Sequence, residues 1–429
     1  MVDRTPQQFS DGDPDGITDN TAAIQAAIDA WEPGDQVVLS GGTFRTAAPL
    51  LISGEDLVLR GDGVVRALSG FTGSRMIEVA AENVVIDTDG LELDQAGEMP
   101  GGVTVVAGAA VGLQVLNVLS RGTQLAFIEL EDSSTDVLIQ GCDHLGQGHG
   151  VVSLDRAGLA RLTLRNNFFQ HAGLGTVGNG ILLHCPTHGA SDFSIIDCEV
   201  RGYIGAAAGH GSGFAFSRVT DGRVIGCTAE SCDGDGFRFE HECQRWLCAD
   251  LRALEIGIPN PVDGSGSGLI AYDSDDIAIV LMTARNCSLH GIALSGEGKD
   301  GSLPTQLRLN GLIERCTVSA TGRDGIHMTS QRSFRIDRNR VHDPSLEAAE
   351  TYAGIHITQQ GATGFENVSG VGNGNLVVLS SASNPLGEIV VRSRSIDVTI
   401  DGIAGSGVFG DAFADSTFWT DATGWLDAA

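Results

Sequence analysis

Lysine is almost missing from this sequence: Lys299 is the single lysine among 26 basic residues, and 55 acidic residues give a formal net charge of −29. The scarcity of lysine leaves almost no candidate for catalysis through a Schiff base. An acidic surface repels nucleic-acid phosphates and attracts anionic lipids only weakly. We therefore expect neither a nucleic acid nor a membrane among the partners.

Long apolar runs are also missing. No stretch of about 18 apolar residues occurs, so we expect no membrane-spanning helix. The opening residues 1–15 are polar and do not resemble a signal peptide. If the protein acts outside a cell, the sequence predicts export by another route or transport on a particle.

Aromatic residues form only 5% of the chain, whereas 59 residues are glycine, and this balance favours a fold with frequent turns. The nine cysteines are odd in number and lack the paired spacing of zinc sites. Four of them occupy one place of a repeat, and we expect them to be buried apolar side chains rather than disulfides or metal ligands: Cys142, Cys198, Cys227 and Cys316.

The first 60 residues have the pattern of a cap with a few short strands. Thr18-Asp19-Asn20-Thr21 supplies helix N-cap chemistry, an apolar face runs over residues 22–31, and Glu32-Pro33-Gly34-Asp35 ends the helix. Short strands are predicted at 36–39, 43–45, 49–52 and 57–59. A helix at the end of a stack of strands shields the open sheet edge.

From about residue 77 the sequence repeats. A strand of the pattern apolar-x-apolar leads to a cysteine or asparagine, then to a glycine-rich turn and a second strand that starts with glycine. These second strands start at Gly150, Gly180, Gly213, Gly236, Gly268, Gly291, Gly325 and Gly354, which are 23 to 34 residues apart. Between first strands starting at 222 and 277, the gap of 55 residues fits two coils, one of them irregular near Trp246. The spacing indicates a coil of fixed girth with loops on some turns.

Parallel stacking explains this repeat better than the alternatives. Two-residue hairpin turns are scarce, which argues against a sandwich, and no helical period separates the strands. In a parallel stack the same position of each coil lies about 4.8 Å from the next. We predict an all-β, single-stranded right-handed parallel β-helix over residues 61–404, with an N-terminal helical cap over residues 1–60.

The opening of the chain carries a family resemblance. Residues 15–28, DGITDNTAAIQAAI, and residues 37–45, VVLSGGTFR, resemble the first segment of the pectate-lyase-like right-handed β-helix superfamily. That superfamily includes polygalacturonases, polysaccharide lyases, alginate epimerases and viral tailspikes. The resemblance implies a fold that lays an extended polysaccharide, or a cell-surface glycan, along its flank.

The catalytic motifs of these relatives match less well. Gly148-His149-Gly150, Gly209-His210-Gly211 and Asp275-Asp276 occur in the wrong order for a polygalacturonase, and its other motifs are missing. Residues 234–242, GDGFRFEHE, are similar to the active-site segment of alginate epimerases, but the spacing differs by one residue and its Asp-Pro is absent. We therefore carry over neither mechanism.

Strand alternation predicts which side chains face outward. After each strand-opening glycine, the first and third residues are apolar and should point inward, so the second and fourth should point outward. This places Arg238, Glu240, Tyr272 and His184 on one outer column, with Asp273 just past Tyr272. We expect Glu240 and Tyr272 on adjacent coils, about 5 Å apart, and His184 about 10 Å from Glu240.

These five residues are our predicted catalytic site, and two chemistries fit them. A lyase or epimerase would use His184 or Tyr272 as the base and Arg238 to neutralise a uronate carboxylate. A hydrolase would use Glu240 and Asp273 as its two carboxyl groups. The alternative is that all five belong to a solvated face. The strongly acidic chain favours neutral or mixed glycans over polyuronates.

No cofactor and no metal are assigned from the sequence. His327 and His356 follow successive strand-opening glycines and together could bind a metal, but no carboxylate or cysteine partner is evident. Asp11-Gly12-Asp13-Pro14-Asp15 and Asp273-Ser274-Asp275-Asp276 offer oxygen ligands for calcium, although neither matches an EF-hand. Turn formation explains both tracts equally well.

The last segment, residues 405–429, concentrates aromatic residues: Phe409, Phe413, Phe418, Trp419 and Trp425. We expect a C-terminal cap or an oligomer contact there rather than a sugar-stacking surface. The overall expectation is an extracellular or virion-surface protein that binds and degrades polysaccharide, a homotrimeric viral tailspike attached to tail or capsid proteins. The alternatives are a secreted lyase or uronate epimerase without virion attachment, and a non-catalytic spike or adhesin.

Overall fold

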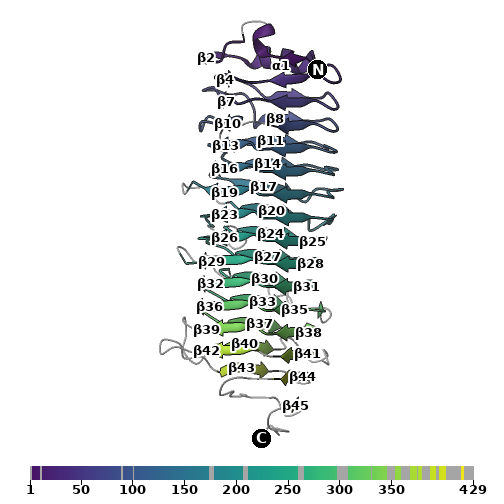
Figure 1. Ribbon diagram of the computed structural model, residues 1–429, viewed down its shortest axis with the longest axis vertical. Helices are drawn as coiled ribbons and strands as arrows, with labels where there is room; N and C mark the ends of the chain where they lie inside the picture. Colours follow the sequence, from purple (N-terminus) through teal and green to yellow (C-terminus); the bar gives the residue numbers. More distant parts are fainter. Residues whose placement is uncertain are drawn as a thin grey trace. The chain divides into compact units, whose positions relative to one another are not determined.

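The structure, a computed structural model, describes residues 2–9, 12–87, 90–99, 101–172, 178–205, 211–258, 265–296, 308–329, 331–344, 353–358, 368–373, 375–378, 387–392, 396–401 and 417–419. The chain forms two compact units, Met1–Ile204 and Gly205–Ala429. Each unit is built from three parallel sheets, which we name A, B and C (Figure 1).

In the first unit each sheet collects strands from successive coils of the chain. Sheet A contains β1 (Asp3–Arg4), β3 (Gln36–Val38), β6 (Val58–Arg60), β9 (Val85–Asp87), β12 (Gln114–Leu116), β15 (Leu138–Gln140), β18 (Thr163–Arg165), β21 (Ala190–Ser191) and β22 (Ser194–Ile196). Sheet B contains β2 (Asp15–Asp19), β4 (Thr43–Thr46), β7 (Val64–Ala67), β10 (Glu92–Asp94), β13 (Leu119–Arg121), β16 (Asp143–Gly146), β19 (Phe168–His171) and β23 (Glu199–Arg201). Sheet C contains β5 (Leu50–Ile52), β8 (Arg75–Val79), β11 (Val103–Ala107), β14 (Ala126–Leu130), β17 (His149–Leu154) and β20 (Ile181–His184).

The second unit repeats the arrangement. Sheet A contains β25 (Val219–Ile225), β28 (Gln244–Ala249), β31 (Asp275–Val280), β34 (Arg308–Leu309), β35 (Leu312–Glu314), β38 (Gln331–Asp337), β41 (Val368–Asn373), β44 (Ile396–Asp401) and β45 (Thr417–Trp419). Sheet B contains β26 (Thr228–Glu230), β29 (Arg252–Ile256), β32 (Thr283–Cys287), β36 (Thr317–Thr321), β39 (Arg340–His342) and β42 (Leu376–Val378). Sheet C contains β24 (Phe214–Ser217), β27 (Phe237–Glu240), β30 (Leu269–Tyr272), β33 (Ile292–Ser295), β37 (Ile326–Thr329), β40 (Ala353–Thr358) and β43 (Gly387–Arg392).

The chain passes through sheets A, B and C in that order and then returns to sheet A, so that each circuit is one coil. Neighbouring strands pair in parallel and in register, for example β12 with β15 in the first unit and β27 with β30 in the second. The predicted parallel β-helix is therefore confirmed in both units. The predicted boundaries at residues 60 and 404 stay predictions, and most of residues 405–429 lies outside the described residues.

Strand-opening glycines stack on one another, as the repeat predicted. A Cβ atom on Gly236 would stand 2.5 Å from the carbonyl oxygen of Gly268, and one on Gly268 would stand 2.5 Å from that of Gly291. The same oxygen of Gly268 accepts the Phe237 N–H at 3.0 Å. Glycine is thus needed here because the next coil approaches too closely for any side chain.

The turn from sheet A to sheet B, where a cysteine or asparagine recurs in the repeat, carries a ladder of small side chains. Asn339 Oδ1 accepts the N–H of Cys316 at 2.9 Å, and Asn375 Oδ1 accepts the N–H of Asn339 at 3.1 Å. The four cysteines of the repeat are buried, as predicted for apolar side chains: Cys142, Cys198, Cys227 and Cys316. The residue before each turn residue takes a left-handed conformation, as Arg315 does before Cys316 (φ 55°).

The predicted helical cap is present as α1 (Thr21–Asp29), preceded by the 3-10 turn η1 (Pro6–Gln8). The helix ends two residues earlier than predicted, before Pro33, which cannot continue a helix. The amide of Gln25 donates to the Leu51 carbonyl and accepts the Leu51 N–H, both at 2.9 Å. The helix therefore supplies hydrogen-bond partners to backbone groups of β5, the edge strand of sheet C. None of the described helices is long and apolar enough to cross a membrane.

The region near Trp246 was expected to be irregular, but it forms an ordinary coil. Strand β28 pairs with both neighbours, with Trp246 between Gly222 of β25 and Ile277 of β31. The indole is buried between Phe216 and Phe239, at ring-centroid distances of 4.6 and 5.0 Å. The gap of 55 residues thus contains two regular coils.

Candidate functional site

The outer face of sheet C in the second unit contains the predicted column. The second residues after the glycines align across the strands as Ala215, Arg238, Ile270, Ala293, His327 and His356. The fourth residues include Ser217 beside Glu240, and Tyr272 beside Ser295 and Thr329. Because Phe239 pairs with Ala271, Glu240 and Tyr272 lie on adjacent strands, as predicted.

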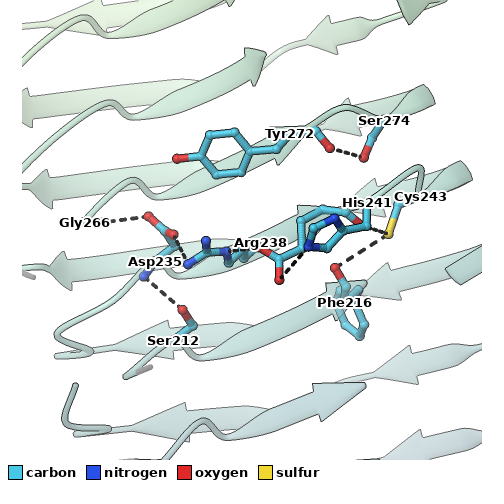
Figure 2. Close-up of polar contacts among 10 residues, drawn as sticks. Ser212, Phe216, Asp235, Arg238, His241, Cys243, Gly266, Tyr272 and Ser274 are labelled. Atoms are coloured by element: carbon cyan, nitrogen blue, oxygen red, sulfur yellow. Dashed lines mark hydrogen bonds and ion pairs between the residues drawn. The ribbon is translucent and has the colours of Figure 1, made fainter. Parts of the chain in front are cut away.

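Arg238 is buried, with 1% of its surface exposed, so it does not belong to a solvated face. Its Nε donates to Glu240 Oε2 at 2.9 Å, and its Nη1 lies 3.5 Å from Asp235 Oδ2 (Figure 2). Asp235 Oδ1 accepts the N–H groups of Gly266 and Ser267, both at 2.9 Å. A buried guanidinium is tolerable because two carboxylates surround it.

Tyr272 covers this ion cluster from the next strand (Figure 2). The Arg238 guanidinium carbon lies 5.6 Å from the centre of the Tyr272 ring, within reach of a cation–π contact. Burial, together with Asp235, raises the pKa of the Tyr272 phenol well above its usual range. The phenol is therefore protonated at neutral pH and can donate a hydrogen bond, and its role as the base of a lyase stays a prediction.

Glu240 is the least enclosed member of the cluster that contains Asp235, Arg238 and Glu240, with 10% of its side chain exposed. His241, whose side chain is half exposed, places its Nε2 4.0 Å from the Glu240 carboxylate. Asp273 follows β30 in a left-handed turn (φ 46°), and its N–H and carbonyl join the neighbouring coils. The structure thus places Arg238, Glu240 and Tyr272 together and Asp273 next to Tyr272 in the chain.

His184 is the exception among the predicted residues. It ends β20 in sheet C of the first unit, where it pairs with Leu154. Its expected separation from Glu240, and its role, stay predictions.

A second polar cluster lies on the same face of sheet C, at β33, β37 and β40. Asp324, immediately before Gly325, is 1% exposed and directs Oδ2 toward three histidines. The Nδ1 atoms of His327, His356 and His290 lie 2.7, 3.3 and 3.4 Å from that oxygen. The carboxylate partner that the sequence did not reveal for His327 and His356 is therefore Asp324.

Protonation in this second cluster follows from burial and pairing. Burial lowers the pKa of His290 to about 3, so that its imidazole is neutral at physiological pH. Burial opposes ionisation of Asp324, but hydrogen bonds to His327 and His356 outweigh it and hold the pKa of Asp324 well below its usual range. The cluster therefore combines an anionic carboxylate with a neutral imidazole.

Sequence reasoning missed four residues of these clusters: Asp235, His290, Arg323 and Asp324. Three of them immediately precede a strand-opening glycine, a position that the inward–outward alternation did not cover. Arg323 is half-buried, and its charge opposes in small part the rise in the pKa of Tyr272 that burial causes and adds to the fall in the pKa of His290. The missed signal was the residue before each glycine, where polar side chains recur at Ser212, Asp235, Ser267, His290 and Asp324.

The acidic tracts considered for calcium lead into strands, since Asp15 begins β2 and Asp275 begins β31. Asp15 Oδ1 accepts the N–H groups of Ile17 and Thr18 at 2.7 and 2.9 Å. Asp276 takes a left-handed conformation (φ 53°) and accepts the Asn310 side-chain amide at 2.6 Å. Asp11 lies outside the described residues, and calcium binding stays a prediction.

Solved structures similar to this chain share little sequence identity with it. Residues 263–415 match the protein family described as "Right handed beta helix region". The A-module of a mannuronan C-5 epimerase from Azotobacter vinelandii is 16% identical, with a TM-score of 0.54, over 97% of this chain and 98% of that one. No curated protein sequence matches the chain.

Two further structures extend this comparison. The catalytic unit of a GH87 α-1,3-glucanase from Streptomyces thermodiastaticus is 14% identical, with a TM-score of 0.62, over 90% of this chain and 68% of that one. The pre-mature gene product 12 of bacteriophage phi29 is 15% identical, with a TM-score of 0.51, over 93% of this chain and 53% of that one. The chain is thus a right-handed parallel β-helix protein.

Proposed function

We propose that the protein binds an extended polysaccharide along the outer face of sheet C in the second unit and hydrolyses it near Glu240. The observation that carries the proposal is the set of ionisable side chains on adjacent strands of this face, from Asp235 and Glu240 to Tyr272. Coil-by-coil stacking presents such groups about every 4.8 Å, a spacing suited to a polymer of repeating sugars. Two of the similar structures, the epimerase and the glucanase, are named for action on polysaccharides.

The pairing of Arg238 with two carboxylates favours hydrolysis over elimination or epimerisation. Those two reactions need a cation that offsets the uronate carboxylate, whereas Arg238 already compensates Asp235 and Glu240. The protonated phenol of Tyr272 is a poor base for removing a carbon-bound proton. A hydrolase requires two carboxyl groups instead, and Glu240 with Asp273 remains our pair.

In the proposed reaction Glu240 acts at the anomeric carbon, directly or through water, and Arg238 orients its carboxylate. The glycosidic bond breaks, the leaving oxygen takes a proton from the second carboxyl group, and water supplies the new hydroxyl group. The net charge of −29 favours neutral or mixed glycans as substrates.

The likeness to a bacteriophage protein supports a place of action outside the cell or on a virion surface. We propose a homotrimeric receptor-binding depolymerase attached to virion tail or capsid proteins. A secreted enzyme without virion attachment is the alternative. Sedimentation of the full chain, which should give a trimer, checks the oligomeric state.

The test is an assay of the purified protein on acidic and neutral glycans, following new reducing ends and the ultraviolet absorbance of unsaturated sugars. We expect reducing ends without unsaturation, and Glu240→Gln should lower kcat at least about 100-fold. Glu314→Gln on sheet A is the matched control and should retain activity. Unsaturated products would establish a lyase instead, and binding without any product would establish an adhesin.

A further inference from the structure

We propose that His290, Asp324, His327 and His356 form a binding site for a divalent first-row transition metal ion such as Zn²⁺. The Nδ1 atoms of three histidines surround one carboxylate oxygen of the second unit, Asp324 Oδ2, at distances of 2.7 to 3.4 Å. One donor atom each from His290, Asp324 and His327 all lie within 4.8 Å of one another.

The distances suit a tetrahedral ion. Donors about 2.0–2.2 Å from zinc stand roughly 3.3–3.5 Å from one another in a tetrahedron. The Nδ1 atoms of His356 and His290 lie 3.3 and 3.4 Å from Asp324 Oδ2, and the shorter His327 contact of 2.7 Å is a hydrogen bond in the metal-free protein. This last contact would have to lengthen for an ion to enter.

One buried ring nitrogen supports a missing partner at this point. His290 Nδ1 is enclosed, yet it makes no hydrogen bond of good geometry. Buried polar atoms are rarely left in this state, because each one costs free energy. An ion at the centre would engage His290 Nδ1 directly.

Thr329 holds His327 in a suitable orientation. His327 Nε2 lies 2.6 Å from Thr329 Oγ1, which can either donate or accept a hydrogen bond. When Nδ1 carries the proton toward Asp324, the hydroxyl donates to Nε2. When a metal occupies Nδ1, Nε2 carries the proton and donates to the hydroxyl, as outer partners of metal-bound histidines commonly do.

The ligand set identifies both the ion class and its role. Three imidazole nitrogens favour zinc-like ions over calcium, which takes six to eight oxygen ligands. Four protein donors fill a tetrahedral shell and leave no open position for a substrate. The ion would therefore have a structural role and stabilise the packing of adjacent coils. The strands concerned are β33, β37 and β40, because the donors lie on them or just before them.

The experiment uses the full chain stripped of metal with a chelator, then titrated with Co²⁺ and Zn²⁺. We expect one Co²⁺ per chain with the intense visible bands of a tetrahedral ion, displacement by Zn²⁺, and a higher Tm with metal. His290→Gln and His356→Gln should each weaken binding at least about tenfold, whereas the matched control His342→Gln on sheet B should not.

X-ray absorption of the zinc-loaded wild-type chain needs no variant and decides the matter if a variant fails to fold. We expect a nitrogen and oxygen shell with imidazole scattering. Sulfur ligands, no stoichiometric uptake, or uptake that survives both substitutions would overturn the proposal. None of these readouts depends on glycan hydrolysis, so this site and the proposed function stand or fall separately.

Discussion

Gly222 lies flat against the indole of Trp246 on the next coil: a Cβ atom at Gly222 would stand 2.4 Å from both Cε2 and Cζ2 of the ring. The indole cannot retreat, because Phe216 and Phe239 pack on it and its Nε1 donates to the Val219 carbonyl at 2.9 Å. The indole of Trp246 therefore excludes any side chain at position 222, and the missing side chain of Gly222 leaves the space that the indole fills. This explains how a large aromatic residue fits within a regular coil.

Gly222→Ala should destabilise the protein by about 1–3 kcal/mol, the usual cost of overpacking a dense core. Chemical denaturation followed by tryptophan fluorescence measures the change. The control is Ala278→Gly on β31, which changes strand propensity without creating a clash. Gly70→Ala is not used, because the positive φ of Gly70 (81°) would add backbone strain. An alanine at 222 without any loss of stability would show that the indole can move.

Arg238→Met should destabilise the second unit by roughly 3–5 kcal/mol, because it leaves two buried carboxylates without a cation. Adding Asp235→Asn and Glu240→Gln to this variant should restore much of the loss by removing both charges. Arg245→Met is the matched control, since Arg245 pairs with Asp221 on an exposed surface and should contribute little. Equal effects of the two arginine substitutions would contradict the buried ion cluster.

His144 should make the protein less stable in acid. Burial lowers the pKa of His144 to about 3 from an ordinary 6.5, so between these values the unfolded chain binds more protons than the folded one. Stability due to this residue is complete above pH 6.5 and is lost as the pH falls toward 3. Denaturant titrations at several pH values should show a shallower acid slope for His144→Leu than for the wild type; parallel slopes would refute the assignment.

Asn339→Leu should destabilise the ladder of turn residues. The substitution removes an acceptor from the Cys316 N–H and a donor from the Ile313 carbonyl, each buried, at about 1–3 kcal/mol per group. Cys227→Val, at an equivalent turn, replaces one small apolar side chain by a slightly larger one and should cost less than Asn339→Leu. Thermal denaturation measures the stability of both variants. A larger loss of stability for Cys227→Val than for Asn339→Leu would contradict the view that the hydrogen bonds of Asn339 stabilise the ladder.

The periodic part of the architecture was predictable from the sequence. Glycines such as Gly236 and Gly268 recur because each faces a backbone oxygen of the next coil, and that contact leaves a visible period. The same period placed Arg238 and Glu240 on the correct face. Their burial was not predicted, because it depends on Asp235, which precedes the strand-opening Gly236 at a position that the inward–outward alternation did not cover.

The second cluster escaped prediction for the same reason. Asp324 precedes its strand and contacts histidines 34 residues back and 32 residues ahead in the chain, at His290 and His356. Such contacts depend on the conformation of the turn that precedes each strand of sheet C. A repeat reveals which residues share a face but not which turn side chains fold back onto it.

The stacking of coils has a consequence for how the second unit comes apart. Each coil bonds only to the one before and the one after, as β27 does to β24 and β30. Cooperativity is then a nearest-neighbour property, and opening can spread stepwise from an end rather than in a single event. Amide protons of β27 and β30 should exchange with solvent more slowly than those of β40 and β43. The latter strands lie nearer the C-terminal end of the stack, so fewer coils must open before their amides are exposed.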